Sequence, residues 1–231
     1  IIKYMKNFLL SIGLILFLIT ENYAHVDHYS KYNYLEYELF RNNKLIGYHK
    51  YSFKRNNGNL TIDNEVEFKI TKLGVNLYKY YAKGKESYVN GVFSGFNSET
   101  NQNKKEKYVN ISIDSKDKNL IIDGSSFKGK VDKDLIIGTW WNHEIVQKKA
   151  QISAVSGRII DQKVQFLGKE EIKIGEKIYK TLKFNFSSSD PSLSKDKKLN
   201  TDIWYEEGTF LWVKAAFDKT GYWEYRLKKV K

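Results

Sequence analysis

The sequence predicts a mainly β protein, built as a curved antiparallel meander sheet with one short helix. Three observations support this fold class. Apolar and polar residues alternate over long stretches, and turn-forming residues separate those stretches. The chain of 231 residues has a single proline, while aromatic residues make up 15%. Few prolines and many aromatic residues favour strands over coil or disorder.

The clearest alternation lies between Leu60 and Ile70. Apolar residues at positions 60, 62, 66, 68 and 70 alternate with polar ones, and only Asn64 interrupts the apolar series. Successive side chains of a strand point to opposite faces, so one face lies in a core and the other in water. Residues 109–114 and 182–187 alternate in the same way.

Turn signals fall between these stretches, and the strongest is Asn90-Gly91, which separates two short apolar segments. Asn and Gly tolerate the positive φ angles that tight hairpins need. Strands joined by short turns are antiparallel neighbours, and the spacing predicts nine to eleven of them. A sheet this wide with one apolar face must curl or fold over another element.

Residues 142–156 are predicted to form the short helix that the sheet covers. Asn142 can cap the helix, and Glu144 follows near its positive end. Gly157 could end it. A short strand in this segment is the alternative.

Residues 1–24 are predicted to contain a signal peptide with a helical apolar centre. Met5 is the only methionine, and we expect translation to start there. Lys3 and Lys6 precede an apolar run over 8–19, which is the layout of a secretory signal. This run is shorter than the roughly 20 residues that span a bilayer. We therefore expect a periplasmic or secreted protein with one β-rich domain over residues 25–231.

Composition limits the partners and cofactors. The chain has no cysteine, which excludes disulfides and thiolate metal sites. Its net charge of +12 suits an anionic envelope component. The lysines are spread along the whole chain, which equally fits a basic surface without a dedicated partner. Export argues against nucleic acid as a partner, and we expect a monomer without a cofactor.

Several motifs between residues 32 and 228 carry a resemblance. They are Tyr37-Glu38-Leu39-Phe40 followed by residues 43–49, Trp140-Trp141-Asn142-His143, Ser156-Gly157-Arg158-Ile159, and Asp202-Ile203-Trp204-Tyr205. Together they resemble a family of uncharacterised exported bacterial proteins, known as a domain of unknown function. That family is similar to LolA/LolB-like periplasmic proteins, whose sheet wraps a helix as a half-open barrel. The resemblance implies a half-barrel with an apolar cavity for acyl chains, and the family has no established catalytic residues to carry over to this sequence.

The candidate ligand-binding residues are Trp140, Trp141, His143 and Trp204. Trp140 or Trp141 would stack on a ligand at the mouth of a cavity, with His143 as a hydrogen-bonding group beside them. Trp204 would belong to an aromatic and acidic strip. In the structural alternative, the paired tryptophans plug the junction between strand and helix, and Trp204 is ordinary core.

The leading functional hypothesis is a non-enzymatic periplasmic protein that binds a lipid or another apolar ligand. One alternative is an envelope interaction module for an anionic polymer or a protein. A third is a hydrolase, which would need His143 or His49 hydrogen-bonded to a carboxylate in an open cleft. Standard catalytic motifs are missing. His25, Asp27 and His28 could bind Zn²⁺ or Cu²⁺ weakly, but we predict no metal site.

Overall fold

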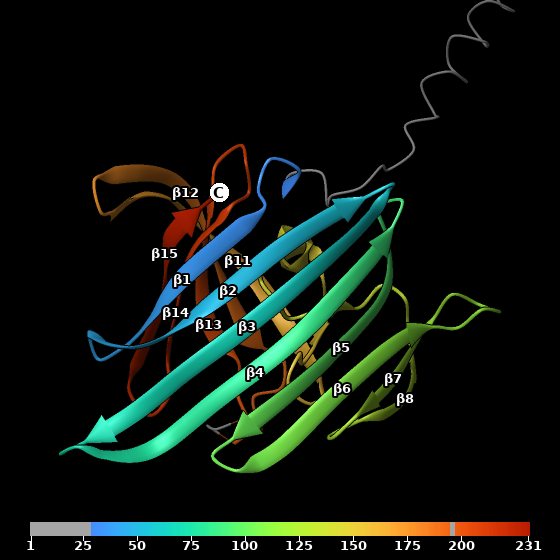
Figure 1. Ribbon diagram of the computed structural model, residues 1–231, viewed down its shortest axis with the longest axis horizontal. Coiled ribbons are helices and arrows are strands. Elements are labelled where there is room, and N and C mark those ends of the chain that lie inside the picture. The colour runs from blue at the N-terminus through green and yellow to red at the C-terminus, as the bar shows by residue number, and fades with distance from the viewer. Residues whose placement is uncertain (1–28, 195–196) are drawn as a thin grey trace, which may run out of the picture.

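The computed structural model describes residues 29–194 and 197–231 (Figure 1). The predicted signal peptide and the cluster at residues 25–28 lie outside the described residues. In the described part of the chain, no helix is long and apolar enough to cross a membrane.

The first half of the described chain is a meander of antiparallel hairpins. Its strands are β1 (Tyr34–Arg41), β2 (Lys44–Asn56), β3 (Asn59–Lys72), β4 (Val75–Val89), β5 (Val92–Gln102), β6 (Lys105–Ile113), β7 (Leu120–Gly124) and β8 (Lys128–Val131). Each pairs with the next, as the predicted turns require. Figure 1 shows the long strands β2 to β6 running side by side as one wall of the molecule.

The second half returns to the first strand. It contains β9 (Ile136–Ile137), the 3₁₀ helix η2 (His143–Gln147), β10 (Ala150–Ile152), β11 (Ile159–Ile174), β12 (Lys177–Ser188), β13 (Asn200–Glu206), β14 (Trp212–Asp218) and β15 (Tyr222–Val230). β15 pairs with β1, so both halves form one sheet of fifteen described strands. Neighbours are antiparallel except β9 and β10. β8 and β9 are the two edges, so the sheet curves without closing into a barrel.

The predicted fold class is confirmed, with two corrections of detail. The described residues form fifteen strands, more than the nine to eleven predicted. Three of them, β8 to β10, are too short to show alternation in the sequence. The helix predicted over 142–156 is shorter than expected. Asn142 caps it as predicted, but Lys148 is already extended, and residues 150–152 pair with β11. The alternative prediction of a short strand is therefore correct for residues 150–152.

The sheet curves around residues 132–158, which we call the central segment. Ile136, Trp141 and Ile145 of this segment join the main core cluster with residues of both halves of the sheet. Buried tyrosine hydroxyls of the sheet donate hydrogen bonds to its backbone: Tyr51 to the carbonyl of Thr139, and Tyr205 to that of Trp140 at 2.8 Å. Such bonds allow an irregular segment to be buried without orphaned carbonyls.

The Ser156-Gly157 motif packs the central segment onto β7. A Cβ atom at Gly124 of β7 would lie 2.6 Å from the carbonyl oxygen of Ser156. Gly157 has a φ of +76°, in the left-handed region that favours glycine. This motif therefore serves close packing.

Candidate functional site

A groove of about 710 Å³ opens at one end of the concave side of the sheet. It is lined mainly by aromatic side chains: Phe68, Tyr78, Tyr80, Phe217, Trp223 and Tyr225. We call it the aromatic groove. Val155 of the central segment also lines it, whereas the turns that follow β1, β3 and β14 surround its mouth. The central segment packs against the concave side next to the groove and leaves this end open.

The wall of the groove is made by side chains from two pairs of neighbouring strands, β3 with β4 and β14 with β15, which β2 and β1 separate in the sheet. Phe68 of β3 stacks on Tyr80 of β4, with ring centroids 4.8 Å apart. It also meets Trp223 of β15 edge-on at 5.2 Å, and Trp223 stacks on Phe217 at 5.9 Å. β2 and β1 lie between β3 and β15 in the sheet, so only its curvature brings Phe68 and Trp223 together.

A smaller cavity of about 300 Å³ adjoins the groove on the other side of Phe217. Both spaces share Phe217 and Lys219 in their linings. Trp140 forms part of the wall of the smaller cavity and packs edge-on against Trp212 and Tyr225. Phe217 therefore contributes to the walls of both spaces, and the smaller cavity has a mixed lining that includes Lys198, Asn200, Thr201 and Asp218.

The mouth of the groove is cationic, whereas its interior is neutral. Arg41 and Lys219 lie at the mouth. Arg41 donates from Nη2 to the carbonyl of Thr220, but its buried Nε has no hydrogen-bond partner among the described residues. Inside, burial raises the pKa of Tyr80 to about 12, and it raises the pKa of Tyr225 as well. Both phenols are therefore uncharged at neutral pH.

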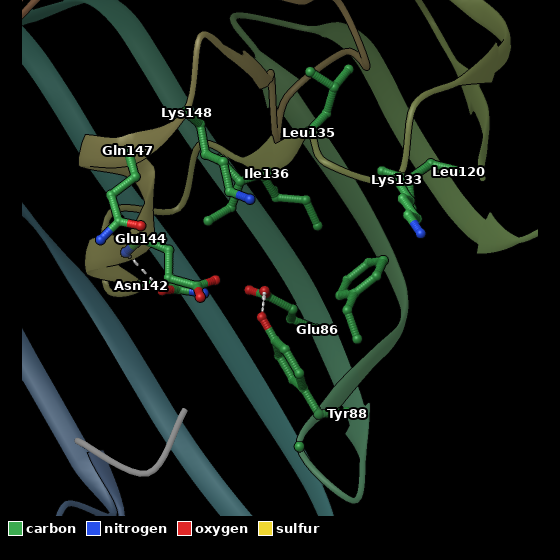
Figure 2. A pocket seen from close by; sticks show the side chains of 13 residues that line it. Glu86, Tyr88, Leu120, Lys133, Leu135, Ile136, Asn142, Glu144, Gln147 and Lys148 are labelled. Carbon is green, nitrogen blue, oxygen red and sulfur yellow. Dashed lines mark hydrogen bonds between the residues drawn. The ribbon is translucent and has the colours of Figure 1, made fainter. Parts of the chain in front are cut away.

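A separate cavity of about 450 Å³ lies between β4 and the start of η2 (Figure 2). Figure 2 shows Glu86 and Tyr88 of β4 on one side, facing Asn142 and Glu144 of the central segment. Lys133 and Lys148 also line it. We call it the Glu86 cavity. Its lining is more mixed than that of the aromatic groove, with acidic, basic and apolar side chains.

Both carboxylate oxygens of Glu86 already accept hydrogen bonds. The Tyr88 hydroxyl donates to Oε1, and Trp141 Nε1 donates to Oε2 at 2.9 Å. Thr139 donates to Oε2 at 3.4 Å. Burial raises the pKa of Glu86, against the lowering effect of these bonds. Glu86 therefore ties β4 to the central segment, which is a structural role, and the aromatic groove is the better candidate site.

The sequence model of a family described as a domain of unknown function (DUF6134) matches residues 37–228. The chain belongs to this family. The match agrees with the resemblance seen in the sequence motifs at the level of a domain of unknown function. A search of curated proteins found no match to this DUF6134 chain.

Solved structures resemble the fold of this DUF6134 domain. A β-barrel-like protein of the domain of unknown function DUF1849, from Brucella abortus, has a TM-score of 0.58 and 11% sequence identity. The match covers 86% of this chain and 96% of that one. A candidate lipoprotein from Parabacteroides distasonis, at 13% identity, covers 86% and 94% with a TM-score of 0.37. The first shows a shared fold, and the second is too distant to support an argument.

The four predicted site residues of the DUF6134 domain do not come together. Trp140 is half-buried beside the aromatic groove and has a φ of +63°, unusual for a residue other than glycine. Trp141 is 1% exposed and packs on Tyr29 and Phe53. Trp141 therefore plugs the junction with the sheet, as in the structural alternative, and only Trp140 reaches a cavity.

His143 and Trp204 lie away from the groove. His143 is buried and stacks on Phe210, with ring centroids 4.3 Å apart. Trp204 lies on the opposite face of β13 from Ile203 and Tyr205, where the ammonium groups of Lys183 and Lys214 cover its ring at 4.7 and 4.9 Å. Long lysine side chains thus shield Trp204 from water on the outer face.

His49 does not fit the role of a catalytic base. Its ring packs against Tyr37, Tyr51, Trp212 and Tyr225 on the concave side. Within the described residues, it has no hydrogen bond to a carboxylate, and its Nδ1 has no partner. Burial lowers the pKa of His49 to about 3, so the imidazole is neutral at physiological pH. In the part of the chain that the structure describes, no three His, Cys, Asp or Glu residues lie together in a group that could hold a metal ion.

Sequence reasoning missed most of the groove. The alternation places Phe68 and Ile70 on the apolar face of a strand, but it does not distinguish a filled core from an open groove. Tyr78 and Tyr80 alternate with Asn76, Lys79 and Tyr81, a weaker version of the same signal. Arg41, next to the Asn42-Asn43 turn, is a positional clue to a charge at the mouth.

Proposed function

We propose that this protein is a non-enzymatic binding protein of the bacterial envelope, which holds an amphiphilic ligand with an acyl chain in the aromatic groove. The single observation that carries the proposal is the aromatic lining of an open groove with two cations at its mouth. The exported location follows from the basic and apolar pattern of residues 1–24 and belongs to the same proposal.

The size and lining of the groove support an apolar ligand. Its volume of about 710 Å³ falls within the range of small-molecule pockets, about 300–1,000 Å³. Burial of an acyl chain contributes about 0.8 kcal/mol for each methylene group, before the costs of association.

The mouth of the groove supports an acidic head group. Arg41 lines the groove, and its guanidinium carries a positive charge that can pair with a carboxylate or a phosphate. Lys219 is exposed at the same mouth and adds a second positive charge. Neutral tyrosines deeper in the groove would leave the acyl chain in apolar surroundings.

The first test is native mass spectrometry of the full chain produced in a bacterium, followed by solvent extraction and lipid analysis. The expected result is a co-purifying lipid at one copy per protein. Titration of delipidated protein with a fluorescent fatty acid then measures affinity. The proposal is overturned if no lipid co-purifies and the fatty acid does not bind.

Matched variants locate the site. Tyr80→Ser and Phe217→Ser remove half-buried aromatic walls of the groove, and we expect each to weaken fatty-acid binding at least about tenfold. Phe166→Ser is the control, because Phe166 is 53% exposed and lies outside the groove lining. Equal losses in all three variants would contradict binding in the groove.

The head group has its own test. Lys219→Gln removes one charge at the mouth but leaves the aromatic walls in place. We expect it to weaken the binding of palmitic acid more than that of palmityl alcohol, which has the same chain without the negative charge. Equal effects on both ligands would show that the mouth does not recognise an acid.

A further inference from the structure

The β3–β4 turn begins with leucine, whereas the other two-residue hairpin turns of this sheet begin with asparagine or glycine. The turns Asn57-Gly58 and Asn90-Gly91 have φ angles of 46° and 79°, and of 49° and 77°. Leu73-Gly74 adopts the same conformation, with 49° and 77°. Asparagine suits the left-handed position and leucine does not. The turn geometry therefore gives no reason for a leucine at this position.

Leu73 is also the most exposed large apolar residue of the described chain. Its side chain is 96% exposed, and Val75 and Leu77 in the same hairpin are 61% and 54% exposed. Leu45 at the neighbouring β1–β2 turn is 52% exposed. Single exposed apolar residues are common on soluble proteins. Here, however, they gather at one end of the sheet, and gathered apolar surface marks an interaction site.

Lysines surround these apolar side chains. Lys72 precedes Leu73, and exposed lysines lie in or directly after adjacent turns at the same end of the sheet: Lys44 at the start of β2, Lys104 after β5 and Lys219 after β14. The backbone N–H of Asn103 donates to the Lys79 carbonyl, which fixes the β5–β6 turn beside the β3–β4 hairpin. Asp218, the last residue of β14, and Glu106, the second residue of β6, are the acidic residues nearest to these turns in the sequence. We call this end of the sheet, with its four turns, the docking rim.

We propose that the docking rim binds the surface of an anionic lipid bilayer, with Leu73 and its apolar neighbours inserted among the lipids. Each lysine near an anionic membrane surface contributes about 1 kcal/mol, and apolar tips add the burial of their side chains.

The shape of the docking rim selects a bilayer over a protein partner. A stable protein interface needs a continuous surface of about 800 Å² on each partner, whereas the docking rim consists of four separate turns. A bilayer accommodates separate apolar tips, since lipids rearrange around each of them. The lysines complement its negative head groups.

The docking rim is also the mouth of the aromatic groove. Leu77, Arg41 and Lys219 line both features. Docking would therefore place the open groove against the bilayer, which gives an acyl chain a path that avoids water. This last step rests on the proposed function, whereas docking itself does not.

The test is co-flotation of the full chain with phosphatidylglycerol vesicles and with phosphatidylcholine vesicles. Leu73→Asn is the key variant because it introduces the asparagine that the Asn57-Gly58 and Asn90-Gly91 turns carry at the same position, so the fold is expected to remain intact. We expect wild-type protein to prefer the anionic vesicles and Leu73→Asn to bind them at least about tenfold more weakly. Lys72→Gln should reduce the preference for anionic lipid.

Val92→Ser is the matched control. Val92 is 70% exposed and follows the β4–β5 turn at the opposite end of β4, so its substitution should leave vesicle binding unchanged. Equal flotation of wild type and Leu73→Asn overturns the proposal. So does sedimentation showing that Leu73→Asn abolishes a dimer, because a second copy is then the occupant. Binding of a fluorescent fatty acid in solution, without vesicles, reports separately on the groove.

Discussion

Phe68 on β3 and Trp223 on β15 meet edge-on across the concave side of the sheet, with ring centroids 5.2 Å apart. The strands β2 and β1 lie between β3 and β15, so the two rings can meet only because the sheet is curved. Leu39 of β1, which lies between them, completes the same buried cluster. The aromatic groove therefore exists only while the sheet stays curved at this end.

The contact predicts energetic coupling between the two rings. In a double-mutant cycle with Phe68→Leu and Trp223→Leu, we expect a coupling free energy of about 0.5–1.5 kcal/mol, typical of aromatic pairs. Urea denaturation of the wild type, the two single variants and the double variant measures it. Strict additivity would mean that the rings do not touch in solution.

Glu86 makes stability depend on pH. Burial raises its pKa in the folded state above the ordinary carboxyl value, so the folded protein holds this proton more tightly than the unfolded chain. The contribution of Glu86 to stability is therefore fully present below the unfolded pKa and is lost as pH rises through the folded pKa. We expect Glu86→Gln to remove this dependence, measured as the free energy of unfolding from pH 4 to pH 8.

A second Glu86 variant separates charge from hydrogen bonding. Glu86→Leu would leave Trp141 Nε1 and the Thr139 and Tyr88 hydroxyls without their acceptor. Each buried group without a partner costs about 1–3 kcal/mol, so Glu86→Leu should be far less stable than Glu86→Gln at neutral pH. Similar stabilities of the two variants would refute the tie between β4 and the central segment.

Removal of a tyrosine hydroxyl that donates to the central segment should lower stability but leave the fold unchanged. Tyr205→Phe leaves the carbonyl of Trp140 without its donor and should lower the free energy of unfolding by about 1–3 kcal/mol. Tyr108→Phe is the control, because that hydroxyl is exposed and bonds Asp123 at 3.2 Å. Its effect should stay within about 0.5 kcal/mol in the same denaturation experiment.

Gly47 allows β2 and β3 to lie close beneath the groove. A Cβ atom there would come within 2.0 Å of the Glu67 carbonyl oxygen and 2.5 Å of Phe68 Cβ. Gly47→Ala should therefore destabilise the protein by about 1–3 kcal/mol, the usual range for overpacking. Gly95→Ala is a milder comparison, since its nearest atom would be 3.3 Å away. A thermal melt ranks the two variants, and equal melting temperatures would contradict the close approach.

Alternation and turn residues in the sequence predicted the strands, but they did not predict which residues line the aromatic groove. The alternation around Leu60–Ile70 and the Asn90-Gly91 turn depend on neighbouring residues, and both features stand in the structure. The separation of Trp204 from Tyr205 on β13 likewise follows from alternation. Whether a concave face is filled depends on the path of the central segment through space. Alternation carries no information about that path.

The same limit explains the predicted site residues. Trp141 and His143 stand out by composition, but their burial follows from how η2 packs against the sheet. Trp140 differs from Trp141 by a single position, and only its left-handed backbone turns it toward the smaller cavity. Neither effect is visible in the sequence.

The pairing of β1 with β15 has a consequence for how the protein folds. These strands occupy the middle of the sheet, yet Tyr37 and its partner Leu227 lie at opposite ends of the described chain. Closing so long a loop is slow, whereas the hairpins on either side can form early. Until β15 arrives, β1 presents an unpaired edge of the kind that promotes aggregation. Folding in the cell should therefore depend on protection of that edge until the last strand is in place.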